Sequence, residues 1–196
     1  MRRLMKLALA VVGATVLLGA VVSSASATRL SSTTRGINAS WTRINFRGGL
    51  GTFDCEIIIN GTGHANTIAK TAGLLMGLVT AANVTRCARG SATMLRETLP
   101  WHVRYDSFLG TLPNITAIRT RVIGLSYRVQ EPTFGINCLI RSSAEQPAFG
   151  TYNRNTTTGA ITSTSVSGSI RCQENSIIGT LEGTSSSITA HTVTLI

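Results

Sequence analysis

The sequence predicts an all-β protein, an antiparallel β-sandwich or barrel of about nine short strands. Three observations indicate this class: apolar and polar residues alternate, β-branched residues are concentrated in short stretches, and clusters of Gly, Asn, Pro or Ser separate those stretches. Hydrophobic residues make up 43% of the 196 residues and charged residues 13%, so the chain has enough apolar material for a folded core. Short strands at such intervals are typical of sandwiches and barrels.

Nine segments carry the strand pattern. In chain order they are 37–46, 53–59, 79–87, 101–108, 115–129, 134–141, 160–172, 176–183 and 188–195. Segment 67–78 is ambiguous, because its apolar positions fit one face of a helix whereas Gly73 and Gly77 disfavour a helix. The polar segment 28–36 is expected to be a flexible N-terminal tail. A single β domain is therefore expected over 37–196.

Segment 1–27 has the features of a secretory signal peptide. Arg2, Arg3 and Lys6 precede an apolar run over 7–22, and small residues lead to a cleavage site after Ala27. The alternative is an uncleaved membrane anchor, but this run is shorter than the roughly 20 residues that a spanning helix needs. We therefore expect a secreted, extracellular protein with no membrane span after cleavage.

Cleavage changes the charge of the chain. The full sequence has 18 basic and 8 acidic residues, a net charge of +10, and three of the basic residues lie in 1–27. The mature chain, 28–196, therefore keeps a net charge of +7. Such a surface attracts anionic cell-envelope polymers, with local patches expected at Arg119 and Arg121 or at Arg86 and Arg89. Nucleic acid is disfavoured, because the arginines are scattered, aromatic residues are few and no recognition motif is present.

Four cysteines lie in the exported part of the chain: Cys55, Cys87, Cys138 and Cys172. An even number of cysteines in an oxidising compartment predicts two disulfides. Zinc is the competing interpretation, but the sequence has no C-x-x-C pair and no histidine close to a cysteine. The sequence allows three ways of pairing the four residues.

An internal comparison favours one of these pairings. Residues 77–84 and 159–166 share a glycine, a β-branched residue, a threonine and a valine at equal spacing, and Arg86-Cys87 corresponds to Arg171-Cys172. This pattern indicates a degenerate internal duplication, in which each half has one cysteine-bearing strand and a later strand with its partner. The duplication favours the pairs Cys55–Cys87 and Cys138–Cys172.

The best candidate for a ligand-facing site is the segment 101–106. In a strand, period-two geometry places three polar residues on one face, His102, Arg104 and Asp106. In the functional interpretation these residues face a ligand, with His102 as the general acid or base and Asp106 orienting it. In the alternative interpretation the segment is a half-buried strand with a solvated polar face.

Other catalytic patterns are poorly supported. A serine-hydrolase triad could draw its histidine and acid from His64, His102, His191, Asp54 and Asp106. The chain has no Gly-x-Ser-x-Gly elbow that would position the serine nucleophile. Glycoside hydrolysis needs a carboxylate pair, but Asp54 and Glu56 are expected to be solvated charges beside Cys55. Eight acidic residues and three histidines leave few ways to build a metal or acid–base site. We therefore expect no metal and no cofactor.

Several stretches resemble a known group of proteins. The cysteine-bearing strand at 53–59, Thr67-Ile68-Ala69-Lys70, Arg86-Cys87 and above all Glu97-Thr98-Leu99-Pro100-Trp101-His102 resemble small exported proteins of high-GC Gram-positive (actinobacterial) bacteria. The resemblance covers about 53–172. It implies a location outside a bacterial cell and a small β domain, and it transfers no catalytic residue.

These observations predict a secreted or cell-surface protein that acts as a non-catalytic binding or structural component. The alternative is a small secreted hydrolase that uses His102 and neighbouring polar residues. A flat, solvent-exposed His102 would argue against the hydrolase, whereas a deep pocket with His102 beside an acid and a hydroxyl would support it.

Overall fold

The computed structural model describes residues 28–48, 51–172 and 178–196, so the predicted signal segment 1–27 lies outside the described residues. The described part is all-β, as predicted, with fifteen strands and two short 3-10 helices, Arg96–Thr98 and Pro132–Phe134. The strands are β1 (Arg29–Ser32), β2 (Gly36–Gly48), β3 (Gly51–Gly63), β4 (Thr67–Ala69), β5 (Leu75–Cys87), β6 (Ser91–Met94), β7 (Trp101–Thr111), β8 (Asn114–Ile123), β9 (Ser126–Glu131), β10 (Ile136–Arg141), β11 (Ala148–Arg154), β12 (Ile161–Cys172), β13 (Ile178–Thr184), β14 (Ser187–Ile188) and β15 (Val193–Leu195).

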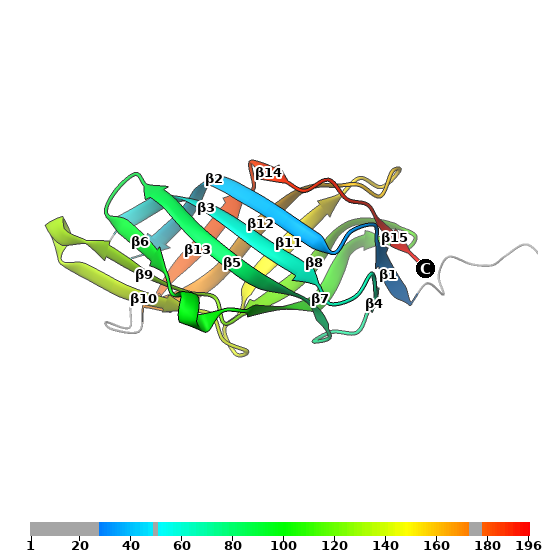
Figure 1. Ribbon diagram of the computed structural model, residues 1–196, viewed down its shortest axis with the longest axis horizontal. Helices are drawn as coiled ribbons and strands as arrows, with labels where there is room; N and C mark the ends of the chain where they lie inside the picture. The colour runs from blue at the N-terminus through cyan, green and yellow to red at the C-terminus, as the bar shows by residue number, and fades with distance from the viewer. Residues whose placement is uncertain (1–27, 49–50, 173–177) are drawn as a thin grey trace, which may run out of the picture.

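The large sheet closes on itself. Its strands follow the order β11-β8-β7-β5-β3-β2-β13-β12, and β12 pairs again with β11, so these eight strands form a closed antiparallel ring. Four of the strands, β2, β3, β5 and β12, run for 12 or 13 residues along the long axis of the molecule (Figure 1). Closure removes the open edges that an isolated sheet would present.

The wall opposite the long strands has two parts. At one end it consists of β7, β8 and β11, and at the other end β10, β9 and β6 branch from β12. Figure 1 shows this second group at the far end of the molecule, beside the end of β5. The chain crosses from the first group to the second at Gly124, whose φ is +89°, a conformation that favours glycine. The continuous strand predicted over 115–129 is therefore wrong, because this turn divides it into β8 and β9.

The interior is filled unevenly along the long axis. Under β6, β9 and β10, large side chains occupy the core, including Phe46 and Phe53, whose ring centroids are 6.2 Å apart. Met94, Tyr127 and Ile140 complete this packing from the opposite wall. Under β7, β8 and β11 the inward positions leave a cavity, so the two ends of one closed sheet have different interiors.

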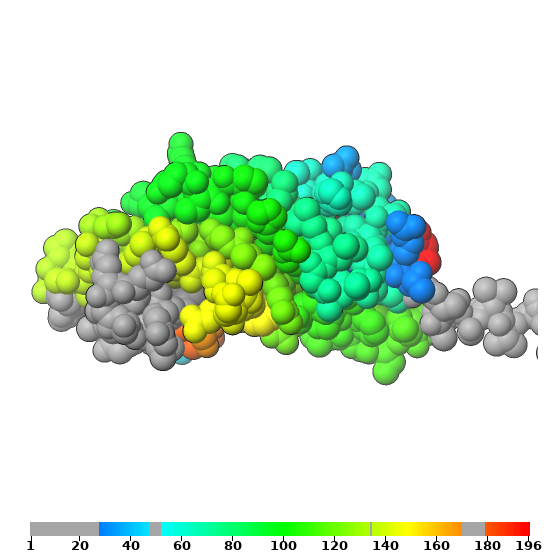
Figure 2. All heavy atoms as spheres, turned by 90° about the horizontal axis from the view of Figure 1, so that it is seen from below, coloured from blue at the N-terminus to red at the C-terminus, as the bar shows by residue number. Residues whose placement is uncertain are grey.

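A small three-stranded sheet covers the hollow end. Here β1 pairs with both β15 and β4, and the buried side chains of Leu30 and Val193 lie in one apolar cluster. Figure 2 shows β1 in blue beside the red C-terminal residues at one end of the molecule. We call these three strands the cap. The expected flexible tail over 28–36 is wrong, because its residues pair in sheets on both sides and Leu30 is only 3% exposed.

Other differences from the predicted strands have similar causes. Segment 67–78 contains no helix: it forms β4, a turn and the start of β5. The predicted strand 188–195 is divided into β14 and β15, because its first residues pair with β2 and its last with β1. Four described strands were not predicted at all, namely β1, β4, β6 and β11. Three of these four have only three or four residues.

One of the two predicted disulfides is confirmed. Cys55 and Cys87 are directly opposite each other on β3 and β5, and their sulfur atoms are bonded across a separation of 32 residues. Cys138 is also disulfide-bonded, but the side chain of Cys172 lies outside the described residues. The pair Cys138–Cys172 therefore stays a prediction.

Candidate functional site

The polar row predicted on β7 lies on the outer surface of the ring. Burial alternates along the strand as expected, with Trp101, Val103 and Tyr105 buried and His102 exposed between them. The polar positions therefore face away from the interior. The cavity lies on the opposite side of this strand, where Trp101 and Val103 contribute to its lining.

Asp106 interacts with arginines rather than with His102. Its carboxylate oxygens accept a hydrogen bond from Arg121 Nε at 2.6 Å and lie 3.7 Å from Arg119 Nε. Four residues of extended strand separate Asp106 from His102 by about 13 Å, so a shared face does not bring their side chains into contact. The expectation that Asp106 orients His102 is therefore wrong. The exposed His102 does not form the pocket that a hydrolase would need.

The other charged candidates also form pairs on the outer surface. Arg104 donates a hydrogen bond to the Gly73 carbonyl at 2.8 Å, and the Arg119 guanidinium stacks 4.0 Å from the centre of the Phe149 ring. Arg119 and Arg121 thus share one carboxylate, so together they keep a net positive charge on this surface. Attraction of anionic envelope polymers to this surface stays a prediction.

The carboxylates that flank Cys55 are partnered in the same way. Asp54 lies 3.3 Å from Arg43 Nε, and Glu56 lies 3.2 Å from Arg86 Nε. These are outward-facing ion pairs between neighbouring strands, so the two carboxylates do not flank a substrate cleft. Arg86 is thereby paired with Glu56, its cross-strand neighbour.

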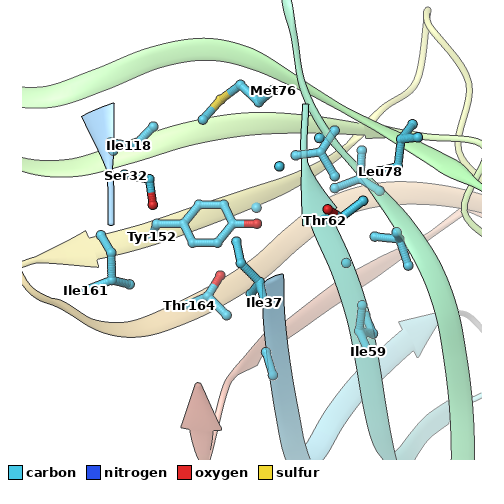
Figure 3. A pocket seen from close by; sticks show the side chains of 18 of the residues that line it. Ser32, Ile37, Ile59, Thr62, Met76, Leu78, Ile118, Tyr152, Ile161 and Thr164 are labelled. Carbon is cyan, nitrogen blue, oxygen red and sulfur yellow. The ribbon is translucent and has the colours of Figure 1, made fainter. Parts of the chain in front are cut away.

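The ring contains an apolar, partly open cavity of about 140 Å³ at its capped end. Strands β2, β3, β5, β7, β8, β11 and β12 all contribute lining residues, and the cap contributes Leu30 and Val193. Figure 3 shows Ile59, Met76, Leu78, Ile118 and Ile161 around this space. No arginine, lysine, aspartate or glutamate is among the described lining residues.

Small inward-facing residues explain why this end is hollow. Inward positions are occupied here by Ala39, Gly61, Gly77, Ala148 and Gly150, whereas bulky side chains occupy them at the other end. At Gly150 close packing excludes a side chain: an added Cβ would lie 2.8 Å from Thr120 Oγ1, which donates a hydrogen bond to the Gly150 carbonyl. The glycines at this end therefore allow neighbouring strands to approach closely and contribute no side chain to the interior.

A few uncharged polar groups face this apolar space. The Tyr152 ring lies across the cavity, and its hydroxyl points toward the side occupied by Thr62 (Figure 3). Thr164 lies directly opposite Tyr152 on β12 and is 4% exposed. The third group is His191, 7% exposed, whose Nδ1 lies 2.8 Å from the Thr189 carbonyl oxygen. Because that carbonyl can only accept, Nδ1 carries a hydrogen.

Burial raises the pKa of each tyrosine in the chain. For Tyr127 and Tyr152 the cause is loss of solvent around the phenol, and for Tyr105 the Asp106 carboxylate adds to the effect of burial. All three phenols are therefore held in the neutral form beyond the ordinary tyrosine pKa of 10.0. Tyr152 in particular stays a hydrogen-bond donor inside the cavity.

Alkaline titration is expected to couple tyrosine ionisation to unfolding. Because the folded state holds these protons more tightly than the unfolded chain does, the tyrosines stabilise the fold fully below about pH 10 and progressively less as the pH rises further. Tyrosinate absorbance and loss of the β circular dichroism signal should therefore rise together above about pH 10. Three phenols that ionised at their ordinary pKa in a protein that stayed folded would contradict this burial.

Sequence reasoning did not single out the residues around the cavity. His191 appeared only among histidines available for a triad, and Tyr152 not at all, because β11 was not predicted. The signal that could have located the cavity is the set of glycines and alanines that neighbouring strands bring together around it. This set can be recognised only when the order of the strands in the sheet is known. His64, the remaining histidine, is exposed and does not line the cavity.

Two further features concern ligands and membranes. Among the residues that the structure describes, no three histidine, cysteine or acidic side chains are grouped so that they could hold a metal ion. Over the same residues, no helix has the length and apolar character required to cross a membrane. Neither finding identifies a partner.

Comparison of the chain with family models, with curated proteins and with solved structures finds no match. The resemblance to small exported actinobacterial proteins therefore stays a prediction.

Proposed function

We propose that the protein is an exported, non-catalytic binding protein that holds a small apolar molecule inside its closed sheet. The observation that carries the proposal is the partly open cavity of about 140 Å³ with a mainly aliphatic lining. An apolar cavity of roughly 150 Å³ is large enough to bind benzene. Closed sheets of about eight strands commonly hold one small ligand in this way.

The cavity supports binding better than hydrolysis. Its described lining has hydroxyl groups and one imidazole but no carboxylate, and the Ser32 hydroxyl is already donated to the Thr34 carbonyl at 2.8 Å. His102, on which the hydrolase alternative depends, lies on the outer face of the ring. The side chains around the cavity can therefore enclose and orient a molecule, but they do not provide a nucleophile with its base and orienting acid.

Tryptophan fluorescence gives a direct test. The chain has two tryptophans, Trp41 and Trp101, and both line the cavity. Addition of methylcyclohexane, an uncharged molecule with a single ring, is expected to change their emission to saturation and to raise the unfolding temperature. Linear, non-saturating changes without a thermal shift would contradict the proposal.

A matched pair of variants locates the binding site. Val79 faces the cavity, whereas the next residue on β5, Thr80, is exposed. Val79→Phe is expected to occupy part of the cavity and abolish saturable binding of methylcyclohexane, and Thr80→Phe to leave it unchanged. Both variants are checked by circular dichroism, since overpacking a core costs about 1–3 kcal/mol. Equal affinities in the two folded variants would place binding elsewhere.

Export and the second disulfide are part of the same proposal. The Cys55–Cys87 bond supports an oxidising compartment, and β1 begins at Arg29, directly after the predicted cleavage at Ala27. The pair Cys138–Cys172 is supported by the disulfide bond that Cys138 makes and by the position of β10 beside β12, where Ile140 is opposite Cys172. The internal duplication is proposed together with this pair. N-terminal sequencing beginning at Met1, or a Cys87–Cys138 peptide in a non-reducing digest, would contradict these points.

A further inference from the structure

We infer that the ligand is a neutral molecule with one hydroxyl or carbonyl oxygen on a ring-sized apolar body, and that the Tyr152 hydroxyl donates a hydrogen bond to that oxygen. This inference rests on the proposed function and specifies the chemical class of the ligand. It follows from three properties of the cavity: its lack of charge, the unpaired hydroxyl that points into it and its size.

The lack of charge excludes ionised ligands. The protein carries an excess of basic residues, yet none of the described residues that line the cavity is a lysine or arginine. A carboxylate or ammonium group transferred into this space would lose its hydration without gaining a counter-ion, which is strongly unfavourable. Basic side chains of the described residues are absent from the lining, so the positive charge does not select the molecule held inside.

The hydroxyl of Tyr152 is a donor without a partner. Tyr152 lies on β11 between Ile118 of β8 and Thr164 of β12, and its hydroxyl points into the cavity (Figure 3). Within the described residues its side chain makes no hydrogen bond. Burial keeps the phenol protonated by raising its pKa. The residue is half-buried, and its hydroxyl faces a mainly apolar space in which a hydrogen bond to a ligand oxygen is a net gain.

The size of the cavity limits the ligand to one ring or a chain of similar volume. A space of about 140 Å³ is smaller than the roughly 300–1,000 Å³ of pockets for drug-sized ligands, so it favours a molecule of about one ring. The apolar lining from Ile59, Leu78, Ile118 and Ile161 fits the body of such a molecule, and Tyr152 can hold its oxygen. Cyclic alcohols, phenols and cyclic ketones have this combination of properties.

The test compares three six-membered-ring probes on the full mature protein: cyclohexanone, methylcyclohexane and cyclohexanecarboxylate. The first two have the same number of heavy atoms and differ in the carbonyl oxygen. We expect cyclohexanone to bind about three- to tenfold more tightly than methylcyclohexane, the contribution of one net hydrogen bond. Cyclohexanecarboxylate, the ionised probe, is expected not to bind.

The decisive variant is Tyr152→Phe, which removes the hydroxyl and keeps the ring. It should reduce the affinity for cyclohexanone by about three- to tenfold and leave that for methylcyclohexane unchanged. Tyr127→Phe is the matched control, because Tyr127 is another buried phenol but does not line the cavity. This control should change neither affinity.

The outcomes separate the inference from the proposed function. If methylcyclohexane and cyclohexanone bind equally, and Tyr152→Phe changes neither, the inference is wrong and the apolar binding function stands; Tyr152 then contacts only water. If the carboxylate binds most tightly, the neutral class is wrong and His191 becomes the group to examine. If none of the three probes binds, the proposed function itself fails.

Discussion

Replacing Trp101 with alanine is expected to lower the free energy of unfolding by about 3–5 kcal/mol, a large part of the stability of a domain of this size. Trp101 is 0% exposed, contacts the core and lines the cavity, so its removal would enlarge an existing void. Its Nε1 also donates a hydrogen bond of 2.9 Å to Thr98 Oγ1, which ties the 3-10 helix Arg96–Thr98 to the ring. Denaturant unfolding followed by circular dichroism measures the change.

A comparison of the two tryptophans separates the contribution of this hydrogen bond from that of burial. Trp41 is 3% exposed, but its Nε1 has no hydrogen-bond partner among the described residues. Trp101→Phe should therefore cost about 0.5–1.5 kcal/mol more than Trp41→Phe, the net value of one hydrogen bond. Equal losses at the two positions would mean that the bond to Thr98 does not stabilise the fold.

The paired substitution of Cys55 and Cys87 by alanine is expected to lower the free energy of unfolding by about 3–4 kcal/mol. In the loop-entropy model, a bond that closes a loop of 32 residues stabilises the fold by restricting the unfolded chain. The two residues also lie opposite each other on β3 and β5, so their loss leaves the strand pairing intact. The denaturant midpoint should fall for the double variant under non-reducing conditions.

The ion pair beside this disulfide provides the control. Glu56 and Arg86 occupy the next register position, and the Arg86 side chain is 85% exposed. Removing such an exposed pair by Arg86→Gln should change stability by less than about 1 kcal/mol. A loss as large as that of the disulfide variant would indicate that the outer surface of β3 and β5, rather than the covalent bond, stabilises this part of the ring.

The strands that could be predicted from the sequence are those in which buried and outward-facing residues alternate along a single segment. On β3, Phe53, Cys55 and Ile57 are buried while Asp54 and Glu56 face outward, and the same alternation holds from Trp101 to Tyr105 on β7. Such alternation follows from one buried and one solvated face. The Cys55–Cys87 disulfide could also be predicted from the sequence, because the internal comparison placed both cysteines in the same half of the chain.

The cap and the cavity could not be predicted in this way. Strands β1 and β15 are very short, and they pair with each other from opposite ends of the described chain. The cavity depends on inward positions contributed by many strands, so no single segment reveals it. His102 and Asp106 do not form a pair, because they share a face of β7 but lie too far apart along it, and His102 is on the outer face. That this face binds a ligand stays a prediction.

Closure of the ring also determines when the backbone hydrogen bonds along its strand edges can form during folding. Strand β2 pairs with β3 next to it in the chain, but its other edge is completed only by β13 and β14, close to the C-terminal end. Until the chain has reached β13, β2 and β12 each keep an exposed row of backbone donors and acceptors, which can pair with another copy. Pairings between such distant segments form slowly. A chain cut before β13 therefore has two unpaired strand edges that the complete chain covers. Strand β13, which closes the ring between β12 and β2, thus also protects the protein from self-association.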